Sequence, residues 1–217
     1  FAIESALREA FLTTAKRQSS VYAVARMLGV RLVRKSPASV SVNLQRGDST
    51  VQKVIPKFTQ FTINSKKFFN RDNIVFPAGV IAVGKAHIYD STVPDVLLYE
   101  GEVKTKSYSS DTTQFREIYL EENGFNVSDE DVQVKITNVI QNVNEVWSRT
   151  RNGNAIWTAD PGEKVYYDST SGLGDTIITF GDGSRGAVPL LGSSIDITYA
   201  ITSGSAGNFG TSNIEVK

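Results

Sequence analysis

The sequence predicts an α+β protein that is mostly β, with a short N-terminal helix pair followed by antiparallel β lobes. Apolar residues recur at helical spacing only in residues 1–32, and from Pro37 onward they alternate with polar residues at a period of two. Short runs of β-branched and aromatic residues then alternate with Gly, Pro, Asn and Asp, which is typical of strands joined by turns.

Three segments are expected along the 217 residues. These are the helix pair at 1–32, a first β lobe at 33–140 and a second β lobe at 141–217. The polar run 137–144 at the lobe boundary is either a linker or a bent strand shared by both lobes. The chain begins at Phe1 without a methionine and already in a helical pattern. We therefore expect it to be a fragment, the N-terminal half of a longer protein.

The two predicted helices carry one apolar stripe each. Ser19 or Ser20 can cap the second helix, and Gly29 is placed to end it. Isolated helices shorter than roughly 12 to 15 residues are marginal in water, so both stripes must pack on something. The predicted helical docking interface consists of Leu7, Phe11, Val21, Val24 and Leu28. The alternative, that these five side chains pack within their own lobe, stays open.

The strands follow from alternation between apolar and polar residues and from the turn residues that separate them. The last predicted strand is the clearest, because Ile195, Ile197, Tyr199 and Ile201 share one face. The predicted strands are 38–44, 51–55, 58–63, 73–76, 80–88, 96–103, 115–120, 132–137, 145–148, 155–158, 164–168, 176–180 and 195–202.

Composition excludes several functions. Lys and Arg number 23 and Asp and Glu number 23, so the chain lacks the cationic excess that binding to nucleic acid requires. The absence of cysteine rules out disulfides, thiolate zinc sites and a cysteine nucleophile. No apolar run approaches the ~20 residues that span a bilayer. We expect no nucleic acid, membrane, small-molecule substrate or cofactor as a partner.

Catalytic groups are scarce. His87 is the only histidine, and Asp90 lies three residues further along a predicted strand, on the opposite face, so a structural histidine is favoured. The acidic run Asp129, Glu130 and Asp131 follows turn residues and precedes a strand, where acidic side chains are ordinarily solvated. The sequence therefore predicts neither a catalytic residue nor a metal site, and hence no enzyme.

The glycine-rich run 181–186 could suggest a phosphate-binding or calcium-binding loop. A phosphate loop needs a helix directly after its glycines, and here Ala187-Val188-Pro189 leads toward a strand. A calcium loop needs acids at alternate positions and a closing Glu, and both are missing. We predict a wide turn that joins two paired strands, one ending at Phe180 and one starting at Ile195.

The same run resembles a known signature. Followed by Ile195-x-Ile197-x-Tyr199 and Gly204, it is similar to the motif of baseplate J-like proteins, which are baseplate wedge subunits of contractile phage tails. Residues 145–147 and 165–168 resemble the strand and turn before that motif, and 8–44 resembles the helix pair and first strand of the T-even-type wedge subunit. The turn at 55–58 and the stretch 62–95 match poorly. The motif residues are Phe180, Gly181, Asp182, Gly183, Gly186, Pro189, Gly192, Gly207 and Asn208.

The resemblance implies a structural role. Such a subunit pairs with a second copy of itself, packs its N-terminal helices into a helical bundle with other wedge subunits, and forms the ring around the tail hub. That ring transmits the trigger for sheath contraction. The expected location is the virion tail baseplate, assembled in the host cytoplasm.

Two alternatives come from the residues themselves. A carbohydrate-binding or adhesin-like β module is suggested by Trp147, Trp157, Tyr166 and Tyr167, whose rings could stack on sugars. A hydrolase would use the carboxylates of Asp129 or Asp131.

Overall fold

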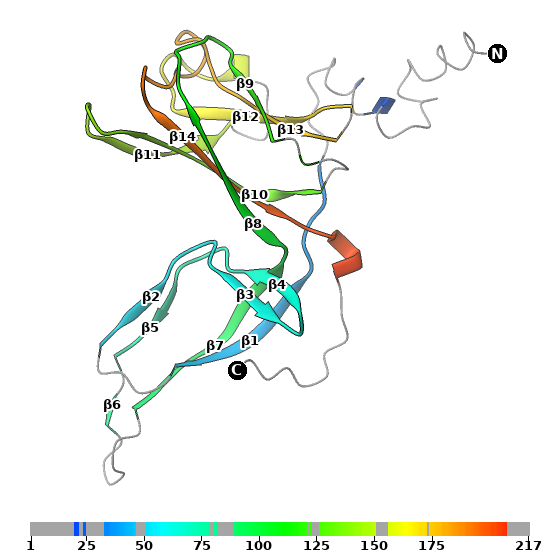
Figure 1. The fold of residues 1–217 in the computed structure, drawn as a ribbon, viewed down its shortest axis with the longest axis vertical. Helices are drawn as coiled ribbons and strands as arrows, with labels where there is room; N and C mark the ends of the chain where they lie inside the picture. Colours follow the sequence, from blue (N-terminus) through cyan, green and yellow to red (C-terminus); the bar gives the residue numbers. More distant parts are fainter. Residues whose placement is uncertain are drawn as a thin grey trace, which may run out of the picture. The chain divides into compact units, whose positions relative to one another are not determined.

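The computed structural model describes residues 20, 21, 24, 33–46, 51–78, 80–81, 89–120, 122, 126–150, 156–172 and 174–207. Most of them form strands in predominantly antiparallel sheets (Figure 1), so the mostly-β prediction is confirmed. The chain divides into two compact units. Unit 1 lies within Phe1–Lys35 and Lys104–Tyr199, and unit 2 lies within Ser36–Val103 and Ala200–Lys217.

This division differs from the expected boundary at 140/141, which falls inside one sheet. Strands β10 (Val127–Asn138) and β11 (Val143–Arg149) form an antiparallel hairpin in which Val134 faces Trp147. The polar run between them is a tight turn, closed by the Gln141 amide, which donates to Asn138 Oδ1 at 3.1 Å. The run is thus a hairpin turn rather than a linker, and it leaves Val139 and Ile140 almost fully exposed, at 89% and 97%.

Most of the seven-stranded sheet belongs to unit 1. Its order is β8 (Glu102–Ser109), β14 (Ser194–Ile201), β10, β11, β12 (Val165–Thr170), β13 (Thr176–Thr179) and β9 (Glu117–Tyr119). β11 and β12 pair in parallel, whereas the pairs β10–β11, β12–β13 and β13–β9 are antiparallel. A parallel pair needs a crossover connection, and the segment between β11 and β12, which carries the 3₁₀ helix η2 (Ile156–Thr158), provides it.

The buried residues explain the sheet. In β14, Ile195, Ile197 and Tyr199 are fully buried, which confirms the predicted alternation over these positions. The alternation ends at Ala200, which is fully buried, whereas Ile201 is only half-buried.

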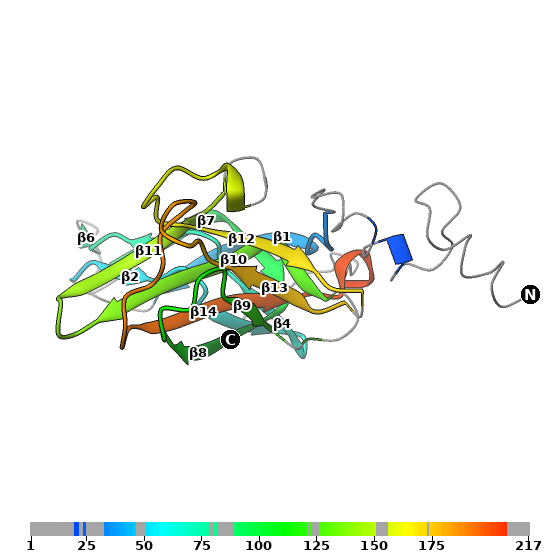
Figure 2. The ribbon, with the colours of Figure 1, turned by 90° about the horizontal axis from the view of Figure 1, so that it is seen from above.

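β12 is buried at every position, and on one face Val165 and Tyr167 pack with Ile156 and Ala159. The loop that carries η2 lies over this strand in the ribbon (Figure 2). The predicted strand at 155–158 is therefore wrong, since this short apolar run forms η2 and covers the sheet.

Side chains of β8, at one end of this strand order, form hydrogen bonds with the end of β9, at the other end. Lys106 Nζ donates to the Leu120 carbonyl at 2.8 Å, and the Tyr108 hydroxyl donates to the Tyr119 carbonyl at 3.4 Å. Lys104 also binds Glu122, with its Nζ 3.0 Å from Oε2. These contacts protect two strand edges that would otherwise be open to pairing.

Unit 2 contains the remaining strands. One sheet has the order β1 (Ser39–Arg46), β7 (Tyr89–Glu100), β4 (Lys66–Phe69) and β3 (Gln60–Ile63), with β6 (Val80–Ile81) also paired to β7. β2 (Lys53–Ile55) pairs with β5 (Ile74–Phe76) in a second, two-stranded sheet. The core of this unit consists of Ile63, Phe68, Ile74, Phe76, Val96 and Leu98.

Strand β4 was not predicted from the sequence. It pairs with β3 through a two-residue turn in which Asn64 and Ser65 both have positive φ, at 48° and 64°. Such conformations are typical of the tight turns that connect hairpins. Two lysines begin β4 and made the segment look like a surface loop. Its other two residues, Phe68 and Phe69, are fully buried.

Much of the N-terminal prediction lies outside the described residues. Ser20, Val21 and Val24 are α-helical, but no helix pair is found in the part of the chain that is described. Leu7, Phe11, Leu28, His87 and Asn208 are also outside it, so the helical docking interface stays a prediction. No described helix has the length and apolar character needed to cross a bilayer.

Candidate functional site

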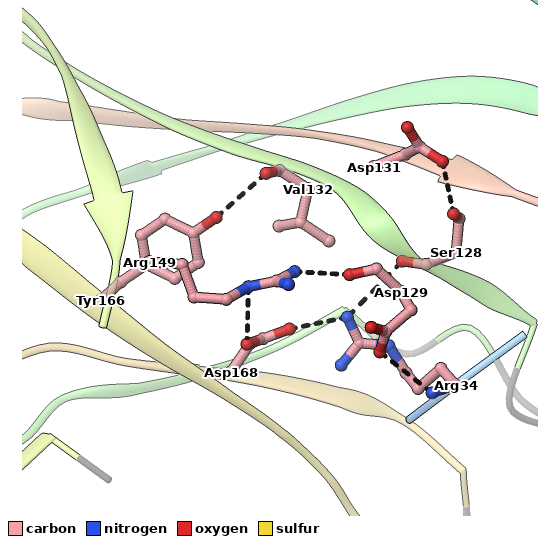
Figure 3. Close-up of polar contacts among 8 residues, drawn as sticks. All are labelled: Arg34, Ser128, Asp129, Asp131, Val132, Arg149, Tyr166 and Asp168. Atoms are coloured by element: carbon pink, nitrogen blue, oxygen red, sulfur yellow. Dashed lines mark hydrogen bonds and ion pairs between the residues drawn. The ribbon is translucent and has the colours of Figure 1, made fainter. Parts of the chain in front are cut away.

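A buried polar network lies inside unit 1 (Figure 3). Arg34 comes from the segment before β1, Asp129 from β10, Arg149 from the end of β11, and Tyr166 and Asp168 from β12. Alternation along β12 brings the last two together, because successive side chains point to opposite faces. Val165 and Tyr167 join the apolar cluster under η2, so Tyr166 and Asp168 face the other way, into the network.

Asp168 is at the centre of this network. Its Oδ2 lies 2.7 Å from Arg34 Nη2, and its Oδ1 lies 3.0 Å from Arg149 Nε. The side chains of Asp168 and Arg34 are 0% exposed, and that of Arg149 is 24% exposed. A buried carboxylate is strongly unfavourable unless it is paired, so the two guanidinium groups are what allows Asp168 to be ionised there.

The main chain of Arg34 and Lys35 is held by β10. The Arg34 amide donates to Asp129 Oδ1 at 3.0 Å, and the Asp129 amide donates to the Lys35 carbonyl at 3.0 Å. Arg149 Nη2 donates to the Asp129 carbonyl at 2.6 Å. Arg34 thus binds β10 through its backbone and β12 through its side chain, which fixes the segment before β1 onto the sheet of unit 1.

The prediction for the acidic run 129–131 is wrong in two respects. These residues lie within β10, and Asp129 and Asp131 are only 8% and 1% exposed, while Glu130 is exposed. Asp131 Oδ2 accepts a hydrogen bond from the Ser128 hydroxyl. The two-residue spacing of Asp129 and Asp131 is the strand period, and this spacing was the one local sign that the run lies in a strand. The Arg34 amide that binds Asp129 is 95 residues away in sequence, so the sequence pattern could not reveal it.

Two buried tyrosines hold their protons firmly. The Tyr166 hydroxyl donates to the Val132 carbonyl at 3.0 Å, and burial raises the pKa of Tyr166 to about 12. Burial, together with the hydrogen bond to Glu122, also raises the pKa of Tyr199. At neutral pH both side chains are therefore hydrogen-bond donors rather than bases.

The network has the character of a structural element. Asp129 and Asp131 are too enclosed for a substrate to reach, and both already accept hydrogen bonds from this chain. Within the described ranges, no group of three or more His, Cys, Asp or Glu side chains could hold a metal ion. The hydrolase alternative requires carboxylates that a substrate can reach, and Asp129 and Asp131 are buried.

The glycine-rich turn is closed by its own backbone. The amides of Gly181, Asp182 and Gly183 donate to the carbonyls of residues 187, 185 and 186 at 3.2, 3.3 and 2.9 Å. Asp182 Oδ1 accepts the Ser184 and Arg185 amides at 2.9 and 2.7 Å. This is an Asx turn, in which the carboxylate satisfies local amides.

Each glycine of this turn has a physical reason. A Cβ on Gly181 would lie 2.1 Å from the Arg185 carbonyl oxygen, so no larger residue fits. Gly183 and Gly186 have φ of 95° and 71°, which L-residues rarely adopt. Phe180 is fully buried and packs edge-on against Trp147, with ring centroids 5.6 Å apart.

The turn docks on the loop after η2. The Gly186 amide donates to the Asp160 carbonyl at 3.1 Å, the Ala187 amide donates to the Glu163 carbonyl at 2.7 Å, and the Gly162 amide donates to the Gly183 carbonyl at 3.2 Å. The backbone groups of the turn are therefore engaged by protein rather than left to face a ligand.

The strands on either side of the turn are not paired with each other, contrary to the prediction. β10, β11 and β12 separate β13 from β14 in the sheet. The turn closes on itself first, and the chain then runs to β14 through a segment held by Ser110. Ser110 Oγ donates to the Pro189 carbonyl at 2.7 Å, and the Gly192 amide donates to the Ser110 carbonyl at 3.1 Å.

Gly207 has a separate role in unit 2. It ends the 3₁₀ helix η3 (Gly204–Gly207), where a Cβ would lie 2.6 Å from Glu100 Oε2. That carboxylate accepts Thr202 Oγ1 at 2.8 Å and the Ser203 amide at 3.1 Å. Gly207 thus permits the close approach that anchors the segment after β14.

The aromatic residues do not form a sugar-binding platform. Trp147, Tyr166 and Tyr167 are 5%, 3% and 7% exposed, and only Trp157 is open to solvent, at 59%. Stacking on a sugar needs an accessible ring face. Of the four rings on which the carbohydrate-binding alternative was based, only Trp157 is accessible for stacking on a sugar.

No protein-family model matches this chain, and no curated protein matches it.

Proposed function

We propose that this chain is a structural subunit of the baseplate wedge of a contractile tail. The observation that carries the proposal is the use of the motif residues, which resemble the baseplate J-like signature. Gly181, Gly183 and Gly186 close a turn, Asp182 satisfies that turn's amides, and Phe180 fills the core. Residues used in this way build a scaffold and need no ligand.

The buried network suits a subunit that transmits mechanical force. The predicted helical docking interface precedes residues 33–35, and those residues are tied to β10 and β12 by Arg34. A pull on the N-terminal helices would reach the sheet through these contacts. A subunit that transmits a trigger needs such a stiff connection between its binding element and its body.

In this proposal the partners are a second copy of the chain and other wedge subunits, which meet the N-terminal helices in a helical bundle. The assembled ring surrounds the tail hub in the virion baseplate, after assembly in the host cytoplasm. The chain acts without cofactor, substrate or nucleic acid.

The test is the composition of purified tail particles from the source. Quantitative mass spectrometry should find this polypeptide in a fixed ratio to the tail-tube and sheath proteins, and disruption of its gene should leave particles without baseplates in electron micrographs. Contractile particles that lack the polypeptide yet keep a complete baseplate would contradict the proposal.

A matched pair of substitutions tests the docking interface. Phe11→Asp should abolish incorporation into particles, whereas Lys164→Met, on the exposed surface of unit 1, should not. Glycan binding by the purified chain that Trp157→Ala abolishes, with incorporation unaffected by Phe11→Asp, would instead support the adhesin reading.

A further inference from the structure

Strand β1 forms one edge of a sheet in unit 2. In the order β1-β7-β4-β3 it has a paired strand on one side only, within the part of the chain that is described (Figure 1). Its antiparallel register with β7 runs from Ser39, opposite Tyr99, to Arg46, opposite Ser91. An edge strand presents a row of main-chain N–H and C=O groups that another strand can bind.

The pairing with β7 determines which main-chain groups of β1 point outward. The Glu100 amide donates to the Ala38 carbonyl at 2.7 Å, one position before the first pair of the register. Opposite residues of an antiparallel pair alternate between hydrogen-bonded and non-hydrogen-bonded pairs. Ser39 and Ser41 are therefore in non-hydrogen-bonded pairs, and their main-chain groups point away from β7.

β1 lacks the features that usually protect an edge strand. It is eight residues long, and residues 38–44 contain neither a proline nor a charged side chain. Natural edge strands are protected by shortness, proline, lysine or inward-pointing charges. The opposite edge of this sheet, β3, has four residues, and the edge strands of the larger sheet, β8 and β9, are linked by side chains. The sequence of β1 therefore does not oppose pairing with another strand.

The core-facing side chains of β1 are incompletely covered. Val40, Val42 and Leu44 pack against the core cluster of unit 2 but are only half-buried. The β7 residues opposite the first two, Leu98 and Val96, are 0% and 9% exposed. A strand beyond β1 would cover this apolar surface, which is favourable by roughly 25 cal/mol per Å².

The sequence of β1 is complementary to itself. In an antiparallel pair of two copies with the two-fold axis at Ser41, Val40 of each copy lies opposite Val42 of the other, and Ser39 lies opposite Asn43. Apolar side chains then meet on one face and polar side chains on the other. No like charges lie opposite each other, and the outward main-chain groups of the two Ser41 residues face each other.

We propose that β1 pairs with β1 of a second copy of this chain, so that two sheets join into one. The pairing is isologous, so it uses both open edges and stops at two copies. It rests on the proposed function for its place in the particle, and it names the contact between the copies. Residues 38–44 of each copy are far fewer than the roughly 20 to 30 residues a side of a standard interface, so we expect a weak dimer with micromolar affinity.

Sedimentation velocity of the purified chain tests the pairing. The chain should shift from monomer to dimer between about 1 and about 500 µM, a range that spans micromolar affinities. Ser41→Pro removes an N–H that points away from β7, a position that tolerates proline, and should weaken the dimer at least about tenfold. Ser41→Thr keeps the N–H and suits a strand, so it should leave the dimer unchanged. The β7 amide shifts in NMR spectra report whether the β1–β7 pairing is intact.

Cross-linking provides a second measurement that does not depend on the proline variant. The chain contains no cysteine, so Ser41→Cys introduces a single thiol. The two-fold axis brings the two thiols together with Cα atoms about 5.5 Å apart, which suits a disulfide. Mild oxidation should cross-link this variant at least tenfold more than Ser109→Cys, at an exposed serine of β8.

Three results would overturn the proposal. These are a chain that stays monomeric over the whole range, a Ser41→Pro variant with intact β7 shifts that dimerises as the unmodified chain does, and equal cross-linking of the two cysteine variants. All of these measurements use the free chain. Absence of the polypeptide from tail particles, with this dimer present, would therefore contradict the proposed function alone.

Discussion

Removing the charge of Asp168 should destabilise unit 1 severely. Asp168→Asn keeps the shape of the side chain but leaves Arg34 buried beside an uncharged amide. Arg34 is 0% exposed and its Nη2 is 2.7 Å from Asp168 Oδ2. Removing one partner from a buried pair costs about 3 to 5 kcal/mol, a large share of the 5 to 15 kcal/mol that stabilises a typical domain.

The chain offers a matched control on its surface. Lys164 Nζ lies 2.6 Å from Glu145 Oε1, a similar distance, but these side chains are 58% and 35% exposed. Solvent screens such a pair, so Lys164→Met should cost at most about 1 kcal/mol. The two substitutions break contacts of nearly equal length, and burial alone separates their expected effects.

Urea unfolding followed by tryptophan fluorescence suits this comparison. Trp147 and Trp157 are the only tryptophans, and both are in unit 1, so emission reports that unit. Trp147 is 5% exposed and dominates the change on unfolding. The slope of the transition should stay constant while its midpoint falls.

A double-mutant cycle isolates the pair. Arg34→Met removes the stranded cation together with Arg34 Nε and Nη1, two buried donors that have no partner within the described residues. In the Asp168→Asn background it should therefore recover stability, with a coupling of about 1 to 3 kcal/mol. If Asp168→Asn costs no more than Lys164→Met, or if the cycle is additive, the account of this network is refuted.

Three further predictions concern other contacts of unit 1. Gly181→Ala should prevent the turn from closing and cost more than about 3 kcal/mol in urea unfolding, whereas Gly183→Ala, with free space but positive φ, should cost about 1 to 2 kcal/mol. Tyr166 has a folded pKa of about 12 against 10.0 unfolded, so its contribution of about 3 kcal/mol is present below pH 10 and lost as pH rises toward 12. Tyr166→Phe should flatten this alkaline decline in stability, and an unchanged slope would contradict the prediction. Asn138→Ala should cost about 1 to 3 kcal/mol in thermal unfolding, because the buried amide bonds the Leu191 carbonyl and Ser193 Oγ.

The elements that could be predicted most clearly from the sequence are strands marked by alternation of apolar and polar residues along the chain. β14 was predicted at 195–202 and lies at Ser194–Ile201, because one face is buried and the other is less so. β12 was predicted at 164–168 and lies at Val165–Thr170, although both of its faces are buried and no apolar–polar alternation marks it. For the run 155–158, strand and 3₁₀ helix look alike from composition, and packing over the sheet decided the outcome.

The candidate site was missed because its contacts are distant in sequence. The Arg34–Asp168 pair spans 134 positions, so nothing near Asp129 or Asp168 reveals that a cation is present. The glycine-rich turn was identified correctly as a turn, because Gly and Asp favour such conformations locally. Its place between β13 and β14, which are not neighbours, depends on strand order and has no local signal.

The separation of Arg34 from Asp168 also affects how the chain folds during synthesis. At about 5 to 20 residues per second, a ribosome makes Asp168 roughly 7 to 27 s after Arg34. Throughout that interval Arg34 lacks its carboxylate, so only the contacts of the Arg34 and Lys35 main chain with Asp129 can hold this segment once β10 has been made. The side-chain anchor of Arg34 is therefore completed only when β12 has been made, shortly before β13 and β14 follow.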